Sequence, residues 1–169
     1  MTWGIPTPLF LELHVGLSLV GIAAGLICVI GMVNGRHHPS WTASFLITTI
    51  LTGVTGFPLA PFGLDPPRIV GIILLCVLAG AVAALYFLPH VHAARGVYVV
   101  CAVMALYLNV FVAVAQSFQK IGPLHALAPT GTEPPFLIAQ VSVLGLFTLA
   151  GYLAFRNFRP RLFALASSV

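Results

Sequence analysis

Five long runs of apolar residues restrict the fold of this chain more than any other feature. A helix needs about 20 apolar residues to cross a hydrocarbon core of about 30 Å, and each run approaches or exceeds that length. Charged residues make up only 6% of the chain, against about 25% in an ordinary soluble domain. We therefore predict an all-α polytopic membrane protein, a compact single-domain bundle of five transmembrane helices at about 9–33, 42–59, 69–88, 97–118 and 136–155.

The connections between these runs are short, so we expect no extramembrane domain. The longest connection, 119–135, is itself apolar, and Ile121, Leu124 and Leu127 recur there at helical spacing. This spacing predicts a short interfacial helix in the fourth loop. No segment repeats another, which disfavours a transporter built from duplicated halves.

The basic residues predict the sidedness of the bundle. With an odd number of spans the two termini lie on opposite sides, and positive residues near span ends favour the cytoplasm. One side would hold five arginines and the other only Arg68 and Lys120; the five are Arg36, Arg95, Arg156, Arg159 and Arg161. We therefore expect the N-terminus outside and the C-terminus in the cytoplasm.

Small and polar residues mark one stripe on each of the first two spans. Small residues let helix backbones approach closely in lipid, where apolar burial contributes little to association. The first stripe has steps of four and three residues and contains His14, Ser18, Gly21, Gly25 and Cys28. The second contains Thr49, Thr52, Gly53 and Gly56. We expect these two helices to pack closely.

Polar residues near the outer ends of the spans are candidate ligand-binding residues, since polar groups within spans are costly and often functional. His14 lies on the stripe of small residues and is expected to face inward, whereas Glu12 points away from it. Asn109 lies near mid-membrane and must face the bundle, either as an interhelical hydrogen bond or as a ligand contact. The full candidate set is His14, Asn109, Gln116, Gln140, His125 and Glu133.

The loops 57–68 and 119–135 are both rich in proline and apolar residues, and they could form a lid over this outer end. A lid above inward-facing histidine and amide groups favours a small amphiphile, such as a quinone or a lipid head group.

The histidines at the inner face form a second candidate site. His37, His38, His90 and His92 follow the first and third spans, and neutral imidazole is a common ligand for zinc and copper. Haem b is an alternative, held at the inner face by His37 or His38 with His90 or His92, or at the outer face by His14 with His125. No CxxC motif accompanies the histidines, and the three cysteines fall inside apolar runs.

Catalysis is not expected, because triad, paired-carboxylate and P-loop patterns are missing from the sequence. The scattered basic residues also argue against a nucleic-acid partner. The chain resembles a group of small bacterial inner-membrane proteins of unknown function, on the stretches TTILTGVTGFP (48–58), ALYLNVFV (105–112) and LAPTGTEPPF (127–136). The resemblance implies a bacterial inner-membrane setting and the same spans, and it implies no activity.

The sequence leaves three functions open. The first is a non-catalytic component embedded in the lipid bilayer, either an accessory subunit of a larger membrane complex or a binder of a small amphiphile. The second is an electron-transfer protein carrying haem b or a metal on its histidines. The third is a small channel or carrier, suggested by Asn109 and the threonines.

Overall fold

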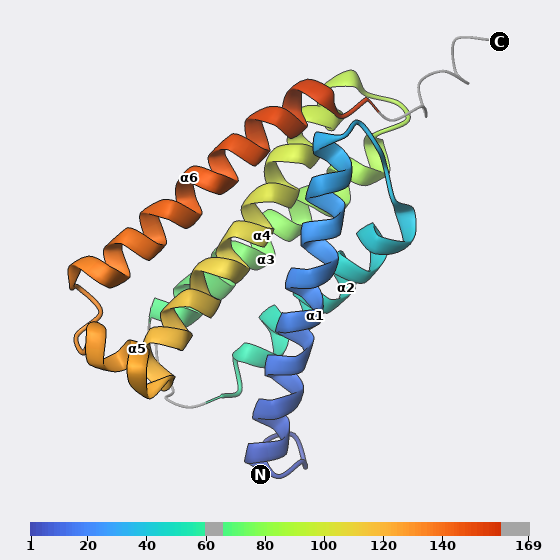
Figure 1. Cartoon of the computed structure of the whole chain (residues 1–169). Helices are drawn as coiled ribbons and strands as arrows, with labels where there is room; N and C mark the ends of the chain where they lie inside the picture. The colour runs from blue at the N-terminus through green and yellow to red at the C-terminus, as the bar shows by residue number, and fades with distance from the viewer. Residues whose placement is uncertain (60–65, 160–169) are drawn as a thin grey trace, which may run out of the picture.

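The computed structural model describes residues 1–59 and 66–159. These residues form a bundle of helices and contain no β-strand. The helices in chain order are α1 (Thr7–Val33), α2 (Pro39–Gly56), α3 (Pro66–Phe87), α4 (His92–Lys120), α5 (Gly122–Leu127) and α6 (Pro134–Asn157). Apart from the short α5, successive helices run in opposite directions along a common axis (Figure 1). The N-terminus and the end of α6 therefore lie at opposite ends of the bundle.

Four helices, α1, α3, α4 and α6, are long and apolar enough to cross a membrane. This length and composition indicate a membrane protein and agree with four of the five expected spans. The fifth expected span lies within α2, which has 18 residues and no charged side chain but is not one of those four. Its many threonines and serines, together with Pro39 and Trp41, lower its hydropathy. The count of five spans is therefore not confirmed.

Prolines mark the starts of α1, α2, α3 and α6. The first turn of a helix has no internal partner for its N–H groups, so the missing N–H of proline costs nothing there. The double prolines Pro66-Pro67 and Pro134-Pro135 thus set where two of the long apolar helices begin.

The centre of the bundle is α4, which packs against α1, α3, α5 and α6. Its residues Tyr98, Val99, Ala102 and Leu106 are fully buried. In contrast to the buried residues of α4, large apolar side chains are exposed on the outer face of α6, among them Ile138, Val141 and Leu146. An apolar exterior of this kind suits hydrocarbon rather than water.

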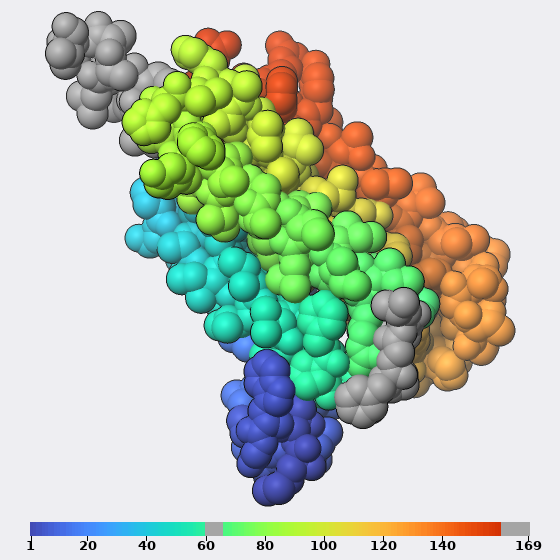
Figure 2. Space-filling model, turned by 180° about the vertical axis from the view of Figure 1, so that it is seen from behind, coloured from blue at the N-terminus to red at the C-terminus, as the bar shows by residue number. Residues whose placement is uncertain are grey.

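The predicted packing of α1 against α2 is confirmed. A Cβ placed on Gly21 would lie 3.1 Å from Thr49 Oγ1, and one on Gly25 would lie 2.8 Å from the ring of Phe45. The absence of side chains at Gly21 and Gly25 therefore makes room for the side chains of α2. Seen from behind, the first turns of α1 project beyond the other helices (Figure 2).

The predicted short helix in the fourth loop is also present, as α5, and it packs against α4. At the other end of the bundle Arg95 donates hydrogen bonds from Nη1 to the carbonyl oxygens of Phe155 and Phe158. Asn157 Nδ2 donates to Val33 O, which ties the end of α6 to the end of α1. Arg36, Arg95, Arg156 and Arg159 therefore share this end. Arg161 and residues 60–65 of the expected lid lie outside the described residues.

Candidate functional site

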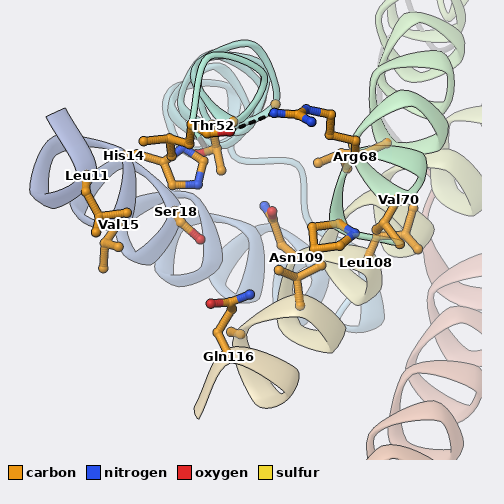
Figure 3. Close-up of a pocket in the computed structure, with 18 of the residues that line it drawn as sticks. Leu11, His14, Val15, Ser18, Thr52, Arg68, Val70, Leu108, Asn109 and Gln116 are labelled. Atoms are coloured by element: carbon orange, nitrogen blue, oxygen red, sulfur yellow. Dashed lines mark hydrogen bonds between the residues drawn. The ribbon is translucent and has the colours of Figure 1, made fainter. Parts of the chain in front are cut away.

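A cavity of about 820 Å³ opens between the first half of α1, the end of α2, the start of α3 and the second half of α4. Small-molecule sites in proteins occupy about 300–1,000 Å³. Its walls are largely apolar and include Leu11, Val15, Leu74, Leu108 and Val112. Several polar side chains from different helices face the same space (Figure 3). The cavity has the size and the mixed lining of a ligand site.

His14 is half-buried at the cavity, and its hydrogen bond to α2 determines which ring nitrogen carries the proton. Its Nδ1 lies 2.9 Å from Thr55 Oγ1, and that hydroxyl donates its own proton to Leu51 O at 2.7 Å. Because a hydroxyl has one proton and the bond to Leu51 O uses it, we assign Thr55 as the acceptor from His14 and the proton of the neutral ring to Nδ1. His14 Nε2 then carries a lone pair and has no partner among the described residues.

Asn109 lines the inner part of the cavity and is only 4% exposed. Its Nδ2 donates to Thr49 Oγ1 of α2 at 3.3 Å, which joins α4 to α2. The inward orientation predicted for Asn109 is therefore confirmed. Its Oδ1 makes no hydrogen bond to the part of the chain that the structure describes, so Asn109 combines an interhelical bond with a free acceptor at the cavity.

Two more polar side chains, Ser18 and Gln116, line the cavity and make no hydrogen bond to described residues. Towards the end of the bundle the lining becomes basic, with Lys120 at the end of α4 and Arg68 at the start of α3. Arg68 Nη2 donates to Phe57 O at 3.1 Å and to Leu59 O at 2.7 Å. Within 1–59 and 66–159 no carboxylate and no thiol lines the cavity. Its chemistry is therefore hydrogen bonding beside positive charge.

The cavity brings together His14, Asn109 and Gln116 from the predicted set. It also includes Arg68 and Ser18, which sequence reasoning did not name as ligand residues. Ser18 follows His14 by one helical turn on the same stripe, and Arg68 directly follows Pro66-Pro67 at the start of a span. Both signals were present in the sequence.

The other predicted ligand residues lie elsewhere. Gln140 is buried between α6 and α4, where its Nε2 donates to Phe111 O at 3.1 Å and its Oε1 has no partner. His125 is exposed on α5. Glu133 accepts hydrogen bonds from the backbone N–H of Thr130 and Thr132 and from the Thr130 hydroxyl. These bonds, led by the Thr130 N–H, lower the pKa of Glu133 to about 2. Glu133 thus holds the turn before α6.

The structure places the histidines that were predicted at the inner face in different surroundings. His37 packs edge-on against Phe158 at 6.0 Å between ring centroids, and its Nε2 is buried without a partner. Burial lowers the pKa of His37 below its ordinary value of 6.5, and nearby His38 lowers it further. His90 and His92 are exposed. Among the described residues no three His, Cys, Asp or Glu side chains are grouped so that they could hold a metal ion.

Comparisons with protein-family models, with curated proteins and with solved structures find no match to this chain. The resemblance to small bacterial inner-membrane proteins therefore stays a prediction, and the cavity is the feature that bears on function.

Proposed function

We propose that this chain is an integral protein of the bacterial inner membrane that binds a small amphiphile, a quinone or a lipid, and that it serves without catalysis as an accessory subunit of a membrane complex. One observation carries the proposal of binding. The cavity combines apolar walls with His14 Nε2, Asn109 Oδ1 and the side chains of Ser18 and Gln116, none of which bonds to a described residue. Polar atoms below the head groups are costly when unpaired, so a ligand that pairs with them is favoured there.

The setting suits a ligand that arrives from the bilayer. Leu11, Val15 and Leu19 line the cavity from α1, and each is also partly exposed on the apolar surface of that helix. The basic residues Arg68 and Lys120 lie towards the end of the bundle. An amphiphile would thus place its tail along apolar side chains and a polar group near the cations.

In this proposal α2 is the fifth span. The hydroxyls of Thr48, Thr52 and Thr55 donate to carbonyl oxygens one turn earlier, at 2.7–2.8 Å. Such back-bonding satisfies hydroxyl groups within a helix and allows threonines to lie in lipid. Burial of Phe45 and Leu46 against the bundle supports the same placement.

The cavity then lies at the outer face. Four described arginines share the opposite end of the bundle, and an excess of positive residues marks the cytoplasmic side of membrane proteins. The N-terminus is accordingly outside and the end of α6 inside.

The binding function is tested by purifying the protein in lipid nanodiscs and identifying co-purified amphiphiles by solvent extraction and mass spectrometry. Ala113 lines the cavity, so Ala113→Phe fills it, whereas Ala83 is exposed on α3 and Ala83→Phe serves as the matched control. We expect one class of quinone or lipid to be enriched over the bulk membrane in the wild type and in Ala83→Phe, and lost in Ala113→Phe. Equal content in all three proteins would refute the proposed site.

The subunit role has its own test. Chemical cross-linking in native membranes, followed by native gel electrophoresis, is expected to place the chain in an assembly with other membrane proteins. Recovery of the protein only as a free monomer would contradict the subunit role and leave the binding function intact.

A further inference from the structure

We propose that the ligand head group carries hydroxyl groups that donate to His14 Nε2 and to Asn109 Oδ1, one hydroxyl to each acceptor, within the cavity. The inference rests on the proposed binding function and specifies the chemistry of the head group. It follows from the direction of the hydrogen bonds that the protein already makes around the cavity.

His14 presents an acceptor to the cavity. The short bond from Thr55 Oγ1 to Leu51 O uses the only proton of that hydroxyl, so we assign the proton in the 2.9 Å contact between His14 and Thr55 to Nδ1. A neutral imidazole has one N–H, so Nε2 carries a lone pair and can accept a hydrogen bond. Gly56 of α2 lies against the ring, since a Cβ there would be 3.4 Å from His14 Cε1. The ring is held in place by α2 on this side.

Asn109 presents a second acceptor from a different helix. Its Nδ2 is used by Thr49, and its Oδ1 is left for the cavity. Figure 3 shows the polar end of Asn109 directed from α4 into the cavity. Two acceptors therefore border the cavity at different depths, because Thr49 and Thr55, their partners on α2, are six residues or about 9 Å apart.

A ligand with only acceptor atoms is poorly suited to this arrangement. The carbonyl oxygens of an oxidised quinone or an ester would face lone pairs at His14 and Asn109, and those groups would lose any water without gaining a donor. A site with polar groups placed for a ligand hydroxyl discriminates strongly against the analogue that lacks it. The two acceptors of the cavity thus favour a ligand that donates hydrogen bonds.

Two further polar side chains of α4 line the cavity beyond Asn109. Gln116 and Lys120 lie two and three turns beyond Asn109 towards the end of the helix, and both line the cavity. An amide and an ammonium group can donate to a second oxygen of the ligand. A head group with one hydroxyl near Asn109 and a further oxygen towards Lys120 fits this order of side chains. Both a hydroquinone and a glycerol head have this chemistry.

Paired ligands test the inference on the intact protein in nanodiscs, with empty nanodiscs as background. The first pair is radiolabelled decyl-benzohydroquinone, kept reduced without oxygen, and decyl-benzoquinone. The second pair is monooleoylglycerol and methyl oleate. We expect the hydroxyl-bearing member of one pair to bind at least about tenfold more tightly than its partner. The pair that shows this preference identifies a phenolic or a glycerol hydroxyl.

Variants connect the preference to the two acceptors. His14→Phe and Asn109→Leu are each expected to reduce the preference to less than about threefold, because each removes one acceptor. Gln140→Leu removes a buried amide outside the cavity, and it should keep the full preference. Equal or tighter binding of the acceptor-only ligands to the wild type would overturn the inference while leaving the binding function standing. If no ligand of either pair binds the wild type above the empty nanodiscs, the proposed binding function itself fails for these ligand classes.

Discussion

Replacing Gly25 with alanine is expected to destabilise the protein through the contact between α1 and α2. The added Cβ would lie 2.7 Å from Leu106 Cδ1 and 2.8 Å from Cδ2 and Cε2 of Phe45. Carbon atoms pack best at about 3.5–4.0 Å, so the overlap is about 1 Å. Leu106 of α4 and Phe45 of α2 are both fully buried, so they yield to the added methyl group only by disturbing packed neighbours. The packing of α1 against α2 and α4 is therefore weakened.

The magnitude follows from two opposing effects. Overpacking of a well-packed core costs about 1–3 kcal/mol. Alanine in place of glycine within a helix contributes about 0.5–1 kcal/mol of stability. The net loss in the free energy of unfolding is therefore about 1–2 kcal/mol for Gly25→Ala. Gly16 is the matched control on the same helix, because a Cβ there meets nothing within 4 Å. Gly16→Ala should be neutral or stabilising.

Reversible unfolding in mixed micelles of a mild detergent and dodecyl sulfate, followed by circular dichroism, measures the difference between the variants. We expect Gly25→Ala to unfold at a lower dodecyl sulfate fraction than the wild type and Gly16→Ala. In a Phe45→Leu background the ring is absent from the overlap, so Gly25→Ala should cost less stability there than it does in the wild type. Equal stability of Gly25→Ala and Gly16→Ala would refute the reasoning, because no close approach would then exist at Gly25.

Three further predictions concern residues outside the spans or at their ends. In protein labelled with ¹³C at glutamate, the Glu133 carboxyl should titrate near pH 2, with Glu12→Gln used to assign the signal; a midpoint near the ordinary value of 4.5 would contradict the capped turn. His37 has a lowered pKa, so the unfolded chain binds more protons and stability falls as the pH drops below about 6.5. His37→Phe should reduce that fall in melting temperature between pH 7 and pH 5, and an unchanged fall would assign it to other groups. Arg95→Gln removes the two hydrogen bonds to the end of α6, which should cost about 1 kcal/mol of stability. Amide hydrogen exchange in the last turn of α6 should then be about fivefold faster. Unchanged exchange would show that these two bonds do not stabilise the end of the helix.

Much of the bundle was predictable from the sequence. The long apolar runs predict helices that cross a membrane, and the helical spacing of Gly21 and Gly25 predicts the contact with α2. The same reasoning predicts the inward orientation of Asn109. These inferences succeed because they depend on local properties of a helix, namely its length, its hydropathy and the face on which a residue lies. The hydropathy of α2 is the exception, since its threonines obscure the signal on which a span count depends.

Hydropathy and helical spacing thus determined, from the sequence alone, which segments are apolar helices and which of their faces turn inward. Only the tertiary structure decided which inward-facing residues share one space. His14, Asn109 and Gln116 border the cavity, whereas Gln140 of α6 is also buried but packs against another side of α4. The bond from His14 to Thr55, which sets the acceptor character of the site, joins residues on separate helices. Contacts of this kind depend on how the helices rotate and pack against one another, and the spacing of residues within one helix carries no information about that.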